Sequence, residues 1–314
     1  MPFPANKLPY GFCARLSELS SPAERYKFQV AAGNFNICPP KVQQVRTDVA
    51  LGKLTNVNGR VIPADIQPFT LGRNEVAECL STLIFENFRL ENFNSNIMNR
   101  VVLQPIYTTL QDCDVSIEFL RKLKTVTACR ERSIIVGGIG NVLSFADTLK
   151  LFPHLDSISF ESVIPAEPWL PDILGFISAP GCKLKELLLT GTYEHFATFS
   201  AEELKTSFET LNRDFRIILK LTDGETTAKA NCDRLKQDLA REFITWNQDE
   251  EMPWVPNIKI DCGRNSTTTY YLCDKHVRRS KADTKCVKPR RTYKRGRKVI
   301  RIPKKKKKVK GGRK

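Results

Sequence analysis

The chain of 314 residues is poor in the features that mark enzymes and membrane-spanning proteins. It has only three histidines, and neither a Gly-x-Ser-x-Gly nor a His-Glu-x-x-His motif occurs, so hydrolase and metalloprotease chemistry is not expected. No run of eighteen apolar residues is present, and the first residues, Met1 to Lys7, lack the apolar core of a signal peptide. We therefore predict a soluble, intracellular protein without catalytic residues, cofactor or membrane contact.

The ten cysteines are scattered along the chain without any Cys-x-x-Cys pair. Cys13, Cys79 and Cys232 lie within apolar patterns. This placement favours reduced, buried thiols over a framework of disulfides.

Two local patterns contain residue types found in ligand sites. Four residues have side chains of the types that bind zinc: Cys262, Cys273, His276 and Cys286. Only the Cys-x-x-His pair among them has the close spacing of zinc ligands, and the other intervals are wide. The glycine-rich segment 137–140 follows an expected strand, and Glu161 stands where a ribose-binding acid would lie, but Leu143 replaces the third glycine of a nucleotide loop. The sequence therefore predicts neither a metal site nor a nucleotide site.

One pattern is repeated in the middle of the chain, as Leu155-x-x-Ile158-x-Phe160-x-x-Val163 and Leu184-x-x-Leu187-x-Leu189-x-x-Thr192. The alternation predicts a short, half-buried strand in each copy. Looser copies span 80–88 and 255–263, and shorter apolar runs at 134–136 and 215–221 also predict strands.

Helical patterns fall between these expected strands, over 117–126, 142–152, 166–179, 201–213 and 232–246. Such βα units cannot bury their cores alone and have to stack on neighbours. The pattern resembles an irregular leucine-rich repeat, with strands on the concave side. The alternative is an ordinary open α/β sheet, which has the same alternation of strands and helices.

Two short amphipathic helices are predicted within residues 8–34. Phe12, Leu16 and Leu19 form one apolar stripe at positions i, i+4 and i+7. Ser21 and Glu24 flank Pro22 and Ala23 in the pattern of a helix start with a capping box. So small a pair must pack on the body or on a partner.

Leu8-Pro9, the apolar stripe and Pro22 together resemble the F-box, and residues 1–46 resemble more particularly the large nematode family of F-box-like proteins. The resemblance implies docking to a Skp-type adaptor of a cullin-RING ubiquitin ligase. The residues that would contact the adaptor are Leu8, Pro9, Phe12, Leu16, Leu19 and Pro22. The alternative is that these helices only cap the end of a repeat stack.

The positive charge is concentrated at the C-terminal end. Residues 275–314 hold 21 lysines and arginines against one acid, a net charge of +20, and the remainder carries 29 basic and 33 acidic residues. Segment 281–314 has too few apolar residues to fold and is predicted to be disordered. Attraction for a polyanion therefore belongs to this tail.

Two short basic motifs lie in the tail. Pro303 to Val309 resembles a nuclear localisation signal read by importin-α, and its basic residues are Lys304, Lys305, Lys306, Lys307 and Lys308. Arg295-Gly296-Arg297 resembles the core of an AT-hook, in which glycine lets two arginines enter a narrow minor groove. The tail therefore predicts a nuclear protein, with weak nucleic-acid binding as a further expectation.

The sequence thus predicts an α+β protein with four parts: an F-box-like helical hairpin (1–46), a connection (47–75) with a hairpin turn at Asn56 to Gly59, an irregular leucine-rich-repeat-like βα body (76–274) and a disordered basic tail (275–314). The predicted function is recognition of an unknown protein target for a ubiquitin ligase. The alternative function is nucleic-acid or chromatin association through the tail.

Overall fold

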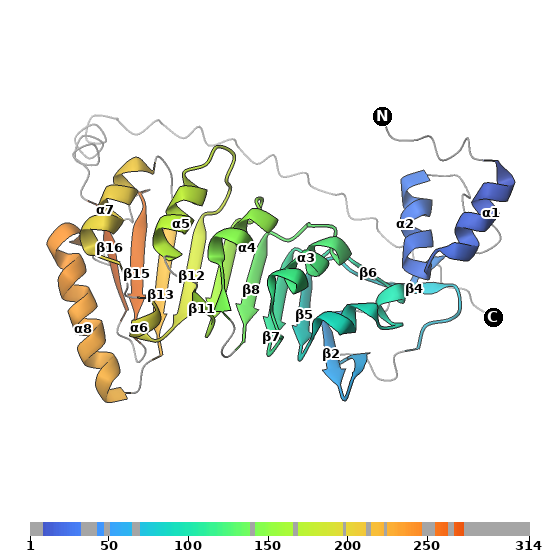
Figure 1. Cartoon of the computed structure of the whole chain (residues 1–314), viewed down its shortest axis with the longest axis horizontal. Coiled ribbons are helices and arrows are strands. Elements are labelled where there is room, and N and C mark those ends of the chain that lie inside the picture. Colours follow the sequence, from blue (N-terminus) through green and yellow to red (C-terminus); the bar gives the residue numbers. More distant parts are fainter. Residues whose placement is uncertain are drawn as a thin grey trace, which may run out of the picture. The chain divides into compact units, whose positions relative to one another are not determined.

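The computed structural model describes residues 9–32, 43–46, 51–64, 70–138, 142–165, 169–196, 199–211, 215–222, 225–246, 255–262 and 267–272 (Figure 1). The chain divides into two units, Met1–Cys273 and Asp274–Lys314, and every described residue belongs to the first. In this described part, no helix has the length and apolar character needed to cross a membrane.

A largely parallel sheet of eleven strands forms the centre of the first unit. From one edge to the other, the strands are β3 (Arg60–Pro63), β2 (Lys53–Val57), β5 (Thr82–Glu86), β7 (Tyr107–Gln111), β8 (Ser133–Gly137), β10 (Ser157–Glu161), β12 (Glu186–Gly191), β13 (Arg216–Leu221), β15 (Asn257–Asp261), β16 (Thr267–Tyr271) and β14 (Ile244–Thr245). Strands β2 to β15 of this order pair in parallel, whereas β3, β16 and β14 pair antiparallel at the edges. The parallel strands follow one another across the sheet in chain order. The sheet therefore has no point at which the winding of the chain reverses.

Helices occupy most of the connections between the parallel strands (Figure 1). They are α3 (Ile117–Val126), α4 (Phe145–Leu151), α5 (Trp169–Ile177), α6 (Tyr193–Phe196), α7 (Ala201–Thr210) and α8 (Glu225–Glu242), with the 3₁₀ turns η2 (Leu90–Asn94) and η3 (Met98–Arg100) between β5 and β7. Helix α4 packs against both α3 and α5. Serine caps begin three of the helices: Ser116 Oγ accepts the backbone N–H of Phe119 at 3.2 Å, and Ser144 and Ser200 act in the same way on α4 and α7.

The sheet has one fully buried face. Its alternate positions carry apolar side chains with almost no exposure: Leu83 and Phe85, Ile134 and Val136, Ile158 and Phe160, Leu187 and Leu189, Ile217 and Leu219, and Ile258 and Ile260. Phe160 stacks on Phe145 of α4 at 3.9 Å between ring centroids. This face and the helices form the core. The predicted strands around 155–163, 184–192, 134–136, 215–221 and 255–263 are thereby confirmed.

The N-terminal helices pack on a second sheet. This sheet is parallel and consists of β1 (Gln44–Arg46), β4 (Glu75–Cys79) and β6 (Val101–Leu103) in the order β1-β4-β6. Helices α1 (Tyr10–Leu19) and α2 (Pro22–Ala32) confirm the predicted pair, and α2 buries Ala23 against Val76 and Val102. A third, two-stranded sheet pairs β9 (Val142–Leu143) with β11 (Ile164–Pro165).

The predicted start of α2 is present in detail. Glu24 Oε2 accepts the backbone N–H of Ser21 at 2.8 Å, and Ser21 Oγ accepts that of Glu24 at 3.3 Å. The expected turn between β2 and β3 also forms, with left-handed φ values of 51° at Asn58 and 83° at Gly59.

Several elements differ from the sequence predictions. The parallel, alternating arrangement is α/β rather than α+β. The helix expected over 142–152 begins as strand β9, because Ser144 caps α4 only from residue 145. The helix expected over 232–246 starts at 225 and ends at 242. The connection predicted over 47–75 contains β2 and β3, which belong to the large sheet, so the body begins before residue 76.

The prediction of a reduced, buried thiol is wrong for Cys232. Cys232 of α8 forms a disulfide with Cys262 at the end of β15, with their Cα atoms 6.3 Å apart. The apolar pattern around Cys232 does reflect burial, but sequence spacing could not reveal that α8 packs beside β16, at the end of the sheet that also holds β15. The other described cysteines, Cys13, Cys79, Cys113, Cys129 and Cys182, are thiols.

Candidate functional site

The apolar stripe of α1 is turned away from the core. Phe12 is 67% exposed and Leu19 is 70% exposed, while Leu16 between them is half-buried. Cys13, the residue after Phe12, is buried. A stripe of large apolar side chains exposed to water is typical of a surface that binds another protein.

The remaining predicted adaptor contacts are Leu8, Pro9 and Pro22. Pro9 is the exposed N-cap of α1, and Pro22 is the half-buried first residue of α2. Leu8 lies outside the described residues. Phe28 and Val30 are further exposed apolar side chains of α2 that were not among the predicted adaptor contacts. They are two residues apart and so lie on different sides of the helix, and their spacing therefore forms no apolar stripe that would have indicated them.

Helix α2, rather than the stripe of α1, makes the contacts that hold the helices to the second sheet. Arg25 is buried and donates from Nη1 to the carbonyl oxygen of Ser20 at 2.6 Å. Gln29 Oε1 accepts the backbone N–H of Gln43 at 2.9 Å. Burial, reinforced by the charge of Glu78, raises the pKa of Tyr26. The hairpin is thus anchored through α2, while Phe12 and Leu19 of α1 stay exposed.

The second candidate surface is the open face of the large sheet, opposite the buried core face. Its middle row follows the strand register and contains Ile84, Thr109, Ile135, Ser159, Leu188, Ile218, Lys259 and Thr269. Most of these side chains are half-buried although the helices pack on the other face. A partly apolar row bordered by polar rows is the composition expected of a protein-binding surface.

Polar pairs fix side chains at both ends of this open face. Near the β3 edge, Lys53 Nζ lies 2.8 Å from Glu86 Oε1, and Thr55 Oγ1 donates to Glu86 Oε2 at 2.9 Å. These hydrogen bonds hold the pKa of the Glu86 carboxyl below its ordinary value. Further along, Arg216 Nη1 lies 3.7 Å from Glu186 Oε2 on the neighbouring strand.

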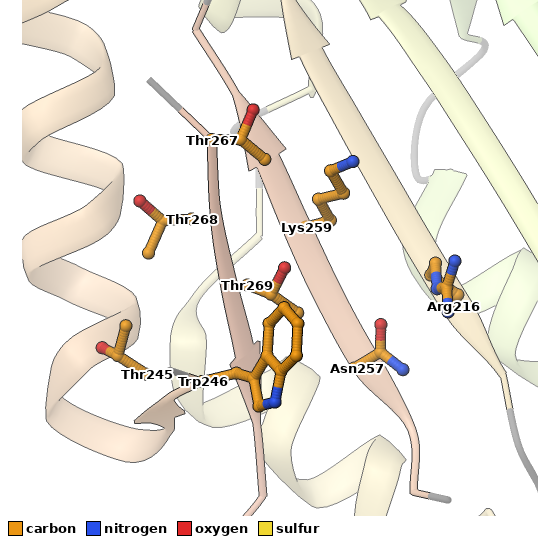
Figure 2. Close-up of a pocket in the computed structure, with 8 residues that line it drawn as sticks. All are labelled: Arg216, Thr245, Trp246, Asn257, Lys259, Thr267, Thr268 and Thr269. Atoms are coloured by element: carbon orange, nitrogen blue, oxygen red, sulfur yellow. The ribbon is translucent and has the colours of Figure 1, made fainter. Parts of the chain in front are cut away.

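A cavity of about 380 Å³ lies at the C-terminal end of this face. It is lined by Arg216, Thr245, Trp246, Asn257, Lys259, Thr267, Thr268 and Thr269 (Figure 2). The side chains come from β13, β15, β16 and the end of β14, and no acidic residue is among them. Asn257 is buried, and its Oδ1 accepts no hydrogen bond within the described part of the chain. The cavity therefore offers an aromatic ring, two cations and hydroxyl groups to a bound molecule.

The glycine-rich segment does not have the setting of a nucleotide loop. A Cβ at Gly137 would lie 2.9 Å from the carbonyl oxygen of Leu110, so glycine is needed there for the close approach of β7 and β8. Gly138 donates its backbone N–H to the carbonyl oxygen of Glu161, and β9 separates this segment from α4. Residues 139–141 lie outside the described part.

Only one of the four zinc-ligand candidates, Cys262, lies in the described part of the chain. Cys262 is committed to the disulfide, while Cys273, His276 and Cys286 lie outside the described residues. The tail residues Lys304 to Lys308 and Arg295 to Arg297 also lie outside them.

The other two histidines lie in different surroundings. His195 Nδ1 lies 3.1 Å from Thr192 Oγ1, and His154 lies beside Cys129. The thiol of Cys129, the carboxyl of Glu131 and the imidazole of His154 form a cluster of metal-ligating types that sequence spacing did not indicate.

Comparison of the chain with models of protein families, with curated proteins and with solved structures gives no match.

Proposed function

We propose that this protein is a substrate-recognition subunit of a cullin-RING ubiquitin ligase. In this proposal the helical hairpin docks on a Skp-type adaptor, and the open face of the large sheet holds a protein target. The observation that carries the proposal is the exposed stripe of α1, which lies on a hairpin that is separately anchored through α2. Burying side chains such as Phe12 and Leu19 against a partner contributes about 1.5–3 kcal/mol each.

We propose further that the body is an irregular leucine-rich-repeat-like solenoid. Its parallel strands follow chain order, and the same turn recurs where they end: Asn87, Asp112 and Ser162, each directly after a strand, have φ values of 55°, 51° and 59°. Cys113 and Phe88 occupy the same position in successive units, three residues after the buried strand residues Leu110 and Phe85. The thiol of Cys113 donates to the carbonyl oxygen of Phe85 at 3.4 Å. Burial raises the pKa of Cys113 to about 11, so this thiol serves as a neutral structural donor.

The open face is the target surface in this proposal. At its C-terminal end this face provides the aromatic ring of Trp246, the cation of Lys259 and the buried acceptor Oδ1 of Asn257. Groups of these kinds can fix a peptide segment in place. Such a surface recognises its target by shape and by local charge pairs and needs no catalytic step.

Leu19→Asp is expected to weaken binding of a purified Skp-type adaptor by about 30-fold, because a buried leucine contributes roughly 2 kcal/mol and a charge cannot replace it. Dissociation constants of the full-length chain would be measured by calorimetry. Val142→Asp is the matched control, since Val142 is 63% exposed but lies on β9, outside the hairpin. Absence of adaptor binding by the unaltered chain, or equal affinity of the Leu19→Asp variant, would refute the adaptor role.

We propose that the C-terminal basic segment directs the protein to the nucleus through importin-α. Changing Lys304, Lys305, Lys306, Lys307 and Lys308 to alanine removes five of the 21 basic residues of segment 275–314 and is expected to abolish nuclear accumulation of a fluorescent fusion. Changing Lys122 and Lys124 of α3 instead should leave the distribution unaltered. Nuclear accumulation that persists after the five changes would show that these lysines are not the nuclear localisation signal.

A further inference from the structure

The connections that precede β8 and β10 bring three side chains with metal-ligating atoms together. Cys129 and Glu131 lie between α3 and β8, and His154 lies between α4 and β10. One ligand atom of each residue lies within 4.8 Å of the other two, and Cys129 Sγ is 3.6 Å from His154 Nε2. The parallel register, in which Ser133 pairs with Ser157, places these two connections side by side.

Glu131 is the informative member of this cluster. Its side chain has no exposure, yet neither carboxyl oxygen has a hydrogen-bond partner among the described residues. The Thr127 hydroxyl and the backbone N–H of Glu131 itself lie near the carboxyl and partly offset the effect of burial on its pKa, but that hydroxyl donates to the carbonyl oxygen of Leu123 at 2.8 Å. Buried carboxyl groups in proteins are almost always hydrogen-bonded, paired with a cation or bound to a metal. Its oxygens lie beside a thiol and an imidazole, which favours the metal.

We propose that Cys129, Glu131 and His154 form a binding site for a divalent transition-metal ion and that zinc is the ion the three side chains fit best. Zinc accepts thiolate sulfur, imidazole nitrogen and carboxylate oxygen together in tetrahedral geometry. Calcium and magnesium take oxygen ligands and do not match this set. Three protein ligands leave one position of the tetrahedron for water or for a group from another molecule.

The protonation of the ligands changes when the metal binds. Burial raises the pKa of the Cys129 thiol, an effect that the charge of Lys124 opposes, and burial also raises the pKa of the Glu131 carboxyl. A metal ion binds the deprotonated forms of both groups, so its bond to Sγ displaces the thiol proton to solvent and its bond to Glu131 is made by the carboxylate. His154 contributes the lone pair of its neutral ring and keeps the proton on its other nitrogen.

The metal would join two successive βα units at the end of the sheet where β8 and β10 begin. Ala128 and Cys129 both have a φ of 57°, in the left-handed region that non-glycine residues seldom adopt. A bond from the metal to Cys129 Sγ would compensate for this conformation by fixing the connection to the one that follows α4. The site is far along the chain from the α1 stripe and does not depend on adaptor binding.

Cobalt titration of the full-length chain, purified, reduced and stripped with a chelator, tests the proposal. The unaltered chain should develop a near-ultraviolet sulfur-to-cobalt charge-transfer band that zinc removes. Cys129→Ser should abolish the band. Since losing even an outer partner of a zinc ligand weakens metal affinity by ~10–100-fold, Glu131→Gln and His154→Gln should weaken zinc binding at least as much.

Matched controls use the same residue types in later connections of the chain. Cys182→Ser and His195→Gln should keep the band and the zinc affinity of the unaltered chain. Zinc should also raise the melting temperature of the unaltered chain but not of the nearly isosteric Glu131→Gln variant, whose folding is checked by circular dichroism. The proposal is overturned if the unaltered chain shows no thiolate band, or if the band persists at full strength in Cys129→Ser and so arises from other cysteines.

Discussion

Phe160→Ala is expected to lower the free energy of unfolding by about 3–5 kcal/mol, the range for truncating a fully buried phenylalanine. Phe160 has no exposure and stacks on Phe145 at a centroid distance of 3.9 Å with the rings 8° from parallel. It lies on β10, between β8 and β12 in the sheet, so the cavity would weaken the contacts of one βα unit with both neighbours. Urea unfolding of the full-length chain would measure the change.

Ser157→Ala is the control for this experiment, because Ser157 lies on the same strand but its side chain points to the open face. A change within about 0.5 kcal/mol is expected there. The comparison tests which face of β10 is buried, since shifting a strand by one residue exchanges its two faces. A loss below about 1 kcal/mol for Phe160→Ala, or a larger loss for Ser157→Ala, would contradict the register.

The strands that sequence analysis found share a strong local signal. Ile158 and Phe160 in β10, like Leu187 and Leu189 in β12, alternate with more polar residues, and each pair fills the core. The pattern over 80–88 was correct at Leu83, Phe85 and Phe88, but Leu80 is 54% exposed because it falls between β4 and β5. Alternation therefore located the strands and their faces, but not their ends.

The missed strands lack this signal. Strand β7 (Tyr107–Gln111) has Leu110 as its only aliphatic residue, and it buries Thr108 in place of a second one. Strand β4 buries the adjacent residues Val76 and Ala77, since it is covered on both sides by the core and by the N-terminal helices. Such strands are specified by their neighbours in the sheet rather than by their own composition.

The candidate sites were predictable to different degrees. Phe12, Leu16 and Leu19 are close in sequence on one helix, so their shared face followed from helical spacing. Cys129 and His154 are 25 residues apart and meet only because β8 and β10 are parallel and in register. The open-face cavity similarly combines Arg216 of β13 with Trp246, which follows β14, although β16 and β15 lie between these two strands in the sheet. Long-range register is the information that a single sequence does not supply.

Reduction of the disulfide between Cys232 and Cys262 is expected to lower the free energy of unfolding by about 3–4 kcal/mol. The two cysteines are 30 residues apart, and a cross-link that closes a loop of this length restricts the unfolded chain by roughly that amount. Urea unfolding with and without reductant would measure it. Cys232→Ser should make stability insensitive to reductant, and Cys182→Ser should leave the sensitivity intact.

The location of the bond makes a more specific expectation possible. The bond ties α8 to the end of β15. The helix is otherwise held by its buried side chains Leu235 and Leu239 and by an ion pair with α7, in which Lys205 Nζ lies 2.7 Å from Glu242 Oε2 of α8. Loss of the bond should therefore speed hydrogen exchange in α8 far more than in β8 or β10. Equal stability and exchange in both redox states would show that packing alone holds the helix. Because the nucleus keeps thiols reduced, a nuclear protein would have this disulfide open and α8 less constrained. Trapping thiols in intact cells would show whether Cys232 and Cys262 are bonded in the compartment to which the basic segment is proposed to direct the protein.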